Sequence, residues 1–258
     1  MLKIENFEVM GWEHAIRGMR NPKNSWEKSD SCWDYDAYPK HIDLTDEHVN
    51  VQYDGDGAFC VGPNDGDLMT RLANGGPVHA KYRRMITVYL DITAPLYWWK
   101  EFDTYKVGTV ANSCSTMHKI HAREFTLEDF STEHLFDGNN PYFIKGRDPL
   151  GRLKETIEEL NFWRLCYIDE SKALGSSVLL DSNGNPMPKK NYWWQMIQLL
   201  PSSYNQKRTV MLNYEVLANI YKWRRNHKLD EWHVFCDWIE SLPYSELITG
   251  PTNLTKGE

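Results

Sequence analysis

The most regular pattern of hydrophobic and polar positions lies in R-R-M-I-T-V-Y-L-D-I-T-A-P, which starts at residue 83. Apolar residues occupy every second position, at Ile86, Val88, Leu90 and Ile92. This alternation predicts a β-strand with one buried face. Pro95 suits the first turn of a following helix, so the ring-rich segment P-L-Y-W-W-K-E-F-D is predicted to be helical.

Helical spacing of apolar residues predicts most of the later elements. The first helix opens at N-D-G-D-L-M-T-R-L with Asn64 or Asp65 as its cap, and it ends at Gly75-Gly76. The sequence T-L-E-D, starting at Thr126, is a capping signal, and D-S-N-G-N-P is a predicted turn. Further helices are predicted in L-K-E-T-I-E-E-L-N-F-W-R-L-C-Y-I, N-Y-W-W-Q-M-I-Q-L-L-P, N-Y-E-V-L-A-N-I-Y-K-W-R-R and L-D-E-W-H-V-F-C-D-W-I.

The chain of 258 residues is long enough for one large domain with a sizeable core. Its first 64 residues are predicted to be an irregular extension, because N-P-K-N, D-Y-D-A-Y-P and Y-D-G-D-G punctuate short apolar pieces there. The sequence contains no internal repeat, low-complexity tract or convincing linker. We therefore expect a single domain over residues 1–258.

Charge and hydropathy exclude some classes of function. A net charge of −7 argues against binding to polymeric nucleic acid, which requires clustered basic residues, but it allows a single nucleotide. No apolar run approaches the roughly 20 residues that span a bilayer. The N-terminal M-L-K-I-E-N-F-E lacks the apolar core of a signal peptide, so we expect a cytoplasmic protein without a membrane segment.

The cysteines and the acidic loops do not indicate a metal site. The scattered cysteines include no C-x-x-C pair, so we expect reduced and mostly buried thiols instead of zinc or a disulfide framework. They are Cys32, Cys60, Cys114, Cys166 and Cys236. The sequence G-P-N-D-G-D has the spacing of neither a calcium loop nor a P-loop.

Aromatic residues make up 13% of the chain, which allows two interpretations. A ring-rich core or subunit interface is the more ordinary one, because aromatic side chains dominate the energetics of both. Alternatively, a few of the rings are stacking platforms for a planar ligand.

One face of the predicted helix near the C-terminus combines apolar and polar residues. Asn213, Leu217, Ile220 and Arg224 follow one another at spacings of four, three and four. An amide and a guanidinium in an apolar stripe are costly to bury without partners. Either they satisfy neighbouring protein groups, or Arg224 offers its planar fork to a carboxylate, a phosphate or a uracil-like edge.

Small polar residues dominate T-Y-K-V-G-T-V-A-N-S-C-S-T-M-H-K, the segment that starts at Thr104. A serine-rich turn that satisfies its own backbone is one interpretation. The other is a loop whose small side chains let backbone amides approach a base or phosphate. Neither Cys114 nor His118 has an evident partner that would make it a catalyst.

The order of these elements and the motifs within them resemble those of the flavin-dependent thymidylate synthases. T-Y-K stands where the family's signature begins R-H-R, and N-S-C-S-T-M matches its N-E-x-S-x-R after one extra residue. The matched positions are His79, Ala94, Pro95, Lys106, Asn112, Ser115, Leu200, Pro201, Asn213, Asn219 and Arg224. The resemblance covers roughly residues 65–243. Glu215 departs from it, because an arginine that helps to hold the flavin is usual there.

The resemblance implies an α+β fold with a central antiparallel or mixed sheet flanked by long helices. It implies that His79, Asn213 and Asn219 bind the cofactor FAD. It further implies that Lys106, Asn112 and Ser113 bind the substrate, and that Ser115 and Arg224 both bind the substrate and take part in catalysis. No metal is implied.

The implied activity is transfer of a one-carbon unit from methylenetetrahydrofolate to C5 of dUMP or a related pyrimidine deoxynucleotide, with NADPH as reductant. The implied assembly is a homo-oligomer, a tetramer in the family. Two alternatives stay open: a hydroxymethylating relative that acts on a modified pyrimidine, and a non-catalytic nucleotide-binding or assembly protein that keeps the fold.

Overall fold

The structure is a computed structural model, and it describes residues 2–34, 53–54, 57–137, 144, 146–175 and 177–250. The chain divides into two compact units. We call one the terminal unit, which comprises Leu2–Ile92, Phe102–Asn112 and Arg208–Glu258. The other, the middle unit, comprises Thr93–Glu101 and Ser113–Lys207.

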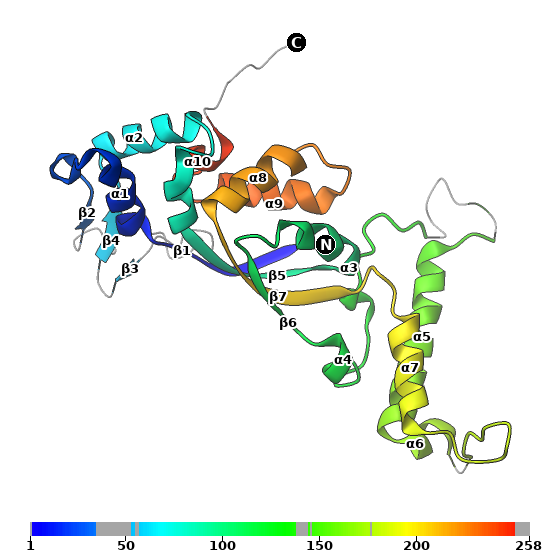
Figure 1. Cartoon of the computed structure of the whole chain (residues 1–258). Coiled ribbons are helices and arrows are strands. Elements are labelled where there is room, and N and C mark those ends of the chain that lie inside the picture. Colours follow the sequence, from blue (N-terminus) through cyan, green and yellow to red (C-terminus); the bar gives the residue numbers. More distant parts are fainter. Residues whose placement is uncertain are drawn as a thin grey trace. The chain divides into compact units, whose positions relative to one another are not determined.

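A four-stranded sheet has the strand order β1-β5-β7-β6 (Figure 1). The strands are β1 (Lys3–Met10), β5 (Thr87–Pro95), β6 (Val110–Ser113) and β7 (Asn205–Asn213). The alternation predicted for β5 is confirmed, because Val88, Leu90 and Ile92 are buried and Tyr89 is exposed. Pro95 ends this strand instead of entering the next helix, but the ring-rich segment after it is helical, as α3 (Leu96–Phe102).

The prediction that the first 64 residues are irregular is wrong for the part that the structure describes. They supply β1, the helix α1 (Trp12–Arg20) and all three strands of a second, antiparallel sheet. That sheet has the order β2-β4-β3, with β2 (Cys32–Asp34), β3 (Tyr53–Asp54) and β4 (Gly57–Cys60). The polar turn sequences concealed these elements because each apolar run is short. The D-Y-D-A-Y-P segment lies outside the described residues.

The helices of the terminal unit surround an aromatic core. Trp12 of α1 meets Tyr214 with ring centroids 5.3 Å apart, and Trp232 is completely buried. The ordinary interpretation of the aromatic content is therefore confirmed for these residues. The α-helices that follow α1 are α2 (Pro63–Asn74), α8 (Tyr214–Arg224), α9 (Asp230–Glu240) and α10 (Glu246–Thr249). Short 3-10 helices are η1 (Asn21–Lys23), η2 (Trp26–Lys28), η3 (Ala80–Met85) and η4 (Asp103–Tyr105).

The cap predicted for α2 is wrong, although its end near Gly75 is confirmed. Gly62 is the N-cap and Pro63 is the first helical residue, where a missing N–H group costs nothing. Asp65 instead turns into the protein and is completely buried. The sequence N-D-G-D offered several capping residues, and only the tertiary partners of Asp65 decide its role.

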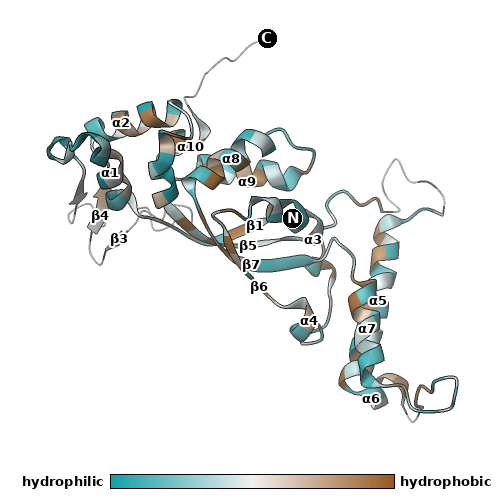
Figure 2. Ribbon diagram, in the orientation of Figure 1, coloured by the Kyte–Doolittle hydropathy of each residue, from teal (hydrophilic) through white to brown (hydrophobic). Residues whose placement is uncertain are grey.

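The middle unit is built on α5 (Pro149–Ile168) and α7 (Lys189–Leu199), which pack against each other. Figure 2 shows hydrophobic and hydrophilic stretches on both, and the buried side chains form one cluster. Its members are Ile120, Phe125, Phe130, Leu153, Ile157, Leu160 and Met196. The remaining helices are α4 (Thr116–Lys119), η5 (Leu127–Asp129) and α6 (Glu170–Leu174).

Two local predictions in the middle unit are confirmed. Thr126 and Asp129 form a reciprocal capping box on η5. The turn D-S-N-G-N-P closes through backbone hydrogen bonds between Asp181 and both Gly184 and Asn185. Throughout the described ranges, no helix has the length and apolar character needed to cross a membrane.

Candidate functional site

The helix α8 carries the polar residues predicted at the C-terminal end of the site. Asn213 is its N-cap and accepts a hydrogen bond from the backbone N–H of Val216 at 3.1 Å. Leu217 and Ile220 face the core, and Arg224 is half-buried in the last turn. The predicted face is therefore confirmed, and the Asn213 amide satisfies a backbone donor of its own helix.

Two aromatic rings hold the Arg224 side chain. Its guanidinium lies over the ring of Trp232 at 4.9 Å and over that of Tyr105 at 5.5 Å. The Arg224 Nε also donates to the Tyr105 hydroxyl at 2.9 Å. Cation–π contacts use the flat face of the guanidinium. These contacts with Tyr105 and Trp232 restrain the position of the guanidinium.

The loop that contains Lys106 packs on the first turn of α8. Gly108 has φ +80, and a Cβ atom at this position would lie 3.2 Å from Asn213 Nδ2 and 3.3 Å from Val216 Cγ2. Glycine therefore suits both the conformation and the close approach. Lys106 is exposed beside Tyr105, whose hydroxyl accepts from Arg224, so Lys106 and Arg224 lie in the same region of the terminal unit.

An arginine and a glutamate face each other at the start of α8. Arg83 Nη1 lies 3.7 Å from Glu215 Oε2, and the two side chains are 11% and 23% exposed. Three buried atoms in this region lack a hydrogen-bond partner among the described residues: Arg83 Nε, Glu215 Oε2 and Thr109 Oγ1. The ion pair offsets the charge of the Glu215 carboxylate, but described protein groups do not meet the hydrogen-bonding capacity of these three atoms.

The serine-rich predicted residues lie on and after β6. Asn112 and Ser113 are exposed. Ser115 is the N-cap of α4, where its Oγ accepts from the backbone N–H of His118 at 3.0 Å. Ser115 belongs to the middle unit and Arg224 to the terminal unit, so a shared pocket remains a prediction.

The predicted cofactor residues His79 and Asn219 are both exposed. His79 is the residue before η3, and a Cβ atom on Gly75 would lie 3.2 Å from its Cδ2. Asn219 lies on α8, the same helix as Asn213. These positions are accessible to a ligand, and their role stays a prediction.

Sequence reasoning missed two residues that shape the region, namely Tyr105 and Trp232, and it missed the pairing of Arg83 with Glu215. Tyr105 had a signal, because it precedes Lys106 in the segment matched to the family signature. Trp232 had none that could separate it from ten other tryptophans. Arg83 stands before the β5 alternation, and its partner Glu215 is far away in the sequence.

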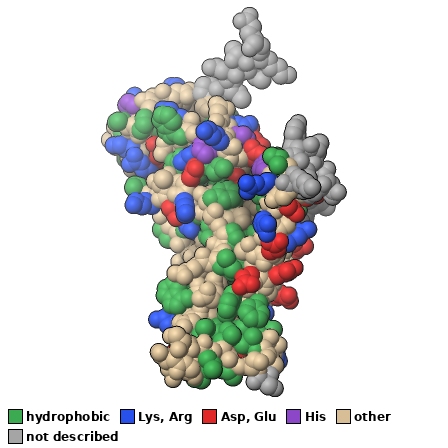
Figure 3. Space-filling view, turned by 90° about the vertical axis from the view of Figure 1, so that its right-hand side faces the viewer, with side chains coloured by type: hydrophobic (Ala, Val, Ile, Leu, Met, Phe, Trp, Pro, Cys, Tyr) green, Lys and Arg blue, Asp and Glu red, His purple; other side chains and the backbone are tan. Residues whose placement is uncertain are grey.

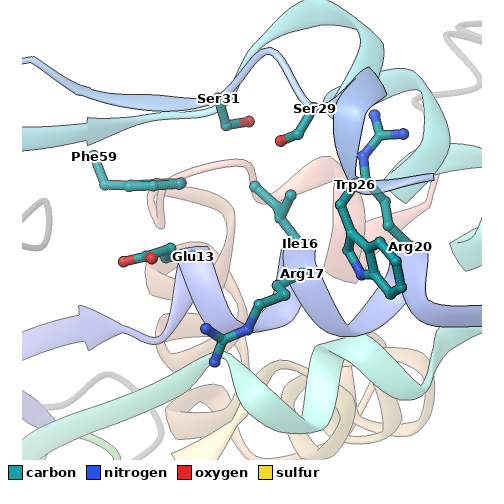
Figure 4. Close-up of a pocket in the computed structure, with 8 residues that line it drawn as sticks. All are labelled: Glu13, Ile16, Arg17, Arg20, Trp26, Ser29, Ser31 and Phe59. Atoms are coloured by element: carbon teal, nitrogen blue, oxygen red, sulfur yellow. The ribbon is translucent and has the colours of Figure 1, made fainter. Parts of the chain in front are cut away.

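A cavity of about 220 Å³ lies elsewhere in the terminal unit, and none of the predicted site residues lines it. Figure 4 shows Glu13, Arg17 and Phe59 among the side chains that line it. The other lining residues are Ile16, Arg20, Trp26, Ser29 and Ser31. The cysteine expectation also needs correction, because Cys32, Cys60 and Cys114 are exposed and only two cysteines are buried.

Comparison with known proteins identifies the fold as that of the flavin-dependent thymidylate synthases. One similar structure is ThyX from Helicobacter pylori, solved with FAD and dUMP. The alignment covers 96% of this chain and 97% of the ThyX chain, with a TM-score of 0.56 and 13% identity. A second structure of that protein, again with FAD and dUMP, gives 15% identity. The resemblance inferred from the residues is thereby confirmed as a likeness of fold.

The structure is also similar to that of PolB from Streptomyces cacaoi, a UMP/dUMP methylase bound with 5-Br dUMP. The alignment covers 96% of this chain and 95% of the other, with a TM-score of 0.52 and 13% identity. No protein-family model matches the sequence, and no curated protein matches it.

Proposed function

We propose that this protein binds a pyrimidine deoxynucleotide and transfers a one-carbon unit from methylenetetrahydrofolate to C5 of dUMP or a related nucleotide. The observation that carries the proposal is Arg224, a guanidinium stacked on Tyr105 and Trp232 in the fold of ThyX. A planar fork held in one orientation suits the polar edge of a pyrimidine.

In this proposal Arg224 reads the base, and Ser115 lies beside the ring that reacts. Lys106, Asn112 and Ser113 bind the remainder of the nucleotide, with Lys106 at the phosphate end. Lys106 suits that role because it is an exposed cation next to Tyr105, which contacts Arg224. The task of these residues is to orient C5 of the base and to balance the phosphate charge.

The residues at the start of α8 fit an anionic cofactor such as FAD. The N-terminus of a helix favours negative charge, and the buried Arg83 Nε and Thr109 Oγ1 lack partners among the described residues. Glu215 does not oppose an anion with its full charge, because Arg83 neutralises it. His79, Asn213 and Asn219 would hold further parts of the cofactor.

When bound, FAD would supply the hydride that completes the methyl group, after its reduction by NADPH. The chain's own residues would bind and orient the nucleotide and the cofactor, and they would exclude water from the site. Arg224 keeps the base in place, and the Arg83–Glu215 pair sets the charge near the cofactor. Both neighbouring ThyX structures were solved with FAD and dUMP, which supports this pairing of ligands.

We further propose a homotetramer in the cytoplasm. Large hydrophobic side chains are exposed on the middle unit, and Figure 3 shows hydrophobic residues gathered on the lower part of one face of the molecule. The exposed hydrophobic side chains of the middle unit include Phe162, Ile168, Val178, Leu180, Trp194 and Leu199. Contiguous exposed apolar surface is typical of subunit interfaces. Light scattering at micromolar concentration would refute this assembly if it gave only a monomer.

The similarity to PolB, described as a UMP/dUMP methylase, supports a uracil nucleotide with either ribose or deoxyribose as the substrate. The hydroxymethylating alternative stays open. The non-catalytic alternative keeps the nucleotide and loses the flavin. The two differ in one observable property, namely whether the protein binds FAD.

The deciding experiment is an absorbance spectrum of the gently purified protein, followed by calorimetry with dUMP, UMP and dCMP. We expect flavin absorbance, present on purification or after incubation with FAD, and tighter binding of dUMP than of dCMP. Colourless protein that cannot be loaded with FAD would refute the redox reaction while leaving nucleotide binding to be decided by the calorimetry.

A further inference from the structure

Two exposed cysteines lie opposite each other in the small sheet. Strands β2 and β4 pair in antiparallel register, and Cys32 is the direct partner of Cys60. Directly opposed residues have Cα atoms about 4.5 or 5.5 Å apart, with both side chains on one face. A disulfide requires Cα atoms about 4.4 to 6.8 Å apart. Either kind of antiparallel pair therefore meets this requirement on the Cα separation.

The two thiols are also close enough to influence each other electrostatically. The pKa of the Cys60 thiol is raised by burial first, and then by the nearby Asp34 and Cys32. Both cysteines are exposed thiols that form no disulfide in this structure. A small reagent can therefore reach either sulfur. Cys114 is the third exposed cysteine, and it lies in the middle unit.

We propose that Cys32 and Cys60 form a redox modification site, a dithiol that reacts with a low-molecular-weight disulfide such as glutathione disulfide and closes to a cross-strand disulfide. One protein thiolate attacks the small disulfide, which releases one small thiol and leaves a mixed disulfide. The other cysteine then attacks the protein sulfur of that bond and releases the second small thiol. Two protein thiols are oxidised, one disulfide is reduced, and the two protons pass to the released thiols.

The crosslink would fix the wall of the cavity in the terminal unit. Ser31 and Phe59 line that cavity, and each directly precedes one cysteine of the pair (Figure 4). Ser31 is already held by hydrogen bonds to Asp65 and from the backbone of Gly62. Phe59 packs edge-on against Trp33. Oxidation would join these two walls covalently. This site is independent of the proposed nucleotide chemistry.

The test treats the full chain with glutathione disulfide and maps its peptides by mass spectrometry. The expected result is a crosslinked Cys32–Cys60 peptide pair lighter by two hydrogens, restored to two free thiols by dithiothreitol. Cys114, exposed in the same sample, should carry one glutathione instead. Separate glutathione adducts on Cys32 and Cys60 would overturn the proposal, as would an unmodified pair beside a modified Cys114.

Single variants separate the pair from general thiol reactivity. In Cys60→Ser the mixed disulfide on Cys32 has no second thiol to resolve it, so a stable glutathione adduct should accumulate there. In Cys114→Ser the crosslink should form as in the wild type. A crosslink from Cys32 to any other cysteine in the Cys60→Ser protein would show that register does not select the partner, and it would also overturn the proposal.

Discussion

Two charged clusters inside the terminal unit differ in how fully their hydrogen bonds are satisfied. Arg20 donates to Asp65 at 2.6 Å and to the carbonyls of Ser25 and Lys28. Asp65 also accepts from the hydroxyls of Ser29 and Ser31. At the start of α8, by contrast, the Arg83–Glu215 distance is 3.7 Å and buried polar atoms lack partners within the described part of the chain.

The contrast separates a charged cluster that protein groups satisfy from one that they leave partly unsatisfied. Low dielectric makes each buried polar group expensive unless it is hydrogen-bonded. The Asp65 cluster meets that condition with protein groups, so it holds α1, α2 and the loop before β2 together. The cluster at α8 does not meet it among the described residues, and the cofactor site proposed above would supply partners for Arg83 Nε and Thr109 Oγ1.

The largest effect should come from breaking the satisfied cluster. In Asp65→Ala the buried Arg20 loses its charged partner, so the free energy of unfolding should fall by about 3 to 5 kcal/mol. Urea unfolding measures this. Asp67→Ala is the matched control, because Asp67 is exposed on the same helix, and its cost should stay within about 0.5 kcal/mol. Equal losses in the two variants would show that the Arg20 pairing contributes nothing special.

The same cluster predicts a dependence of stability on pH. Burial alone would raise the pKa of Asp65, but hydrogen bonds from Ser29, Ser31 and Arg20 outweigh it, and the native pKa lies below 3.8. The stabilisation is therefore complete well above pH 3.8 and is lost as the pH falls through the lower native pKa. The difference in unfolding free energy between wild type and Asp65→Asn should shrink between pH 6 and pH 3. A constant difference would mean that the ionisation of Asp65 is not the cause.

Prediction from sequence succeeded where the information is local. The alternation in β5 and the spacing in α8 each lie within one element, and both are confirmed. Asp65 was misread as a cap because its partners lie 34 to 45 positions away. The Cys32–Cys60 register could not be predicted for the same reason, since no local pattern fixes which residues of two separated strands will pair.

The candidate site divides in the same way. Asn213 and Arg224 were located by helical periodicity, and they do lie on one side of α8. Trp232 could not be identified, because it lies on α9 and contacts Arg224 only through the fold of the turn between α8 and α9. The Arg83–Glu215 pair joins η3 to α8, and only tertiary folding brings these elements together.

A smaller effect is expected at the other end of α8. In Arg224→Lys a point charge replaces the planar fork that stacks on Tyr105 and Trp232, so binding of dUMP should weaken by about 1 to 3 kcal/mol with little change in stability. Calorimetry checks the affinity. Arg225→Lys is the matched control, because Arg225 pairs with Asp237 and Glu240 on the surface. Unchanged affinity in Arg224→Lys would assign its aromatic contacts to the scaffold.

The smallest effect tests the contrast between the clusters most directly. Thr109→Val replaces a buried hydroxyl that has no partner among the described residues with a methyl group of similar size. Removing such a hydroxyl should leave stability unchanged or raise it by up to about 1 kcal/mol. Ser31→Ala, which removes a hydroxyl bonded to Asp65, should instead cost about 1.5 to 3 kcal/mol.

Thermal unfolding of the two variants side by side measures both changes. The two clusters differ as described if stability is unchanged or rises in Thr109→Val and falls in Ser31→Ala. If Thr109→Val also weakens the binding of FAD or another anion, the stability gained and the affinity lost belong to the same hydroxyl. A protein that keeps an unsatisfied group at a cost to its fold then does so for the ligand. A loss of stability in Thr109→Val as large as that in Ser31→Ala would show that the α8 cluster is satisfied in solution, and the distinction between the two clusters would fail.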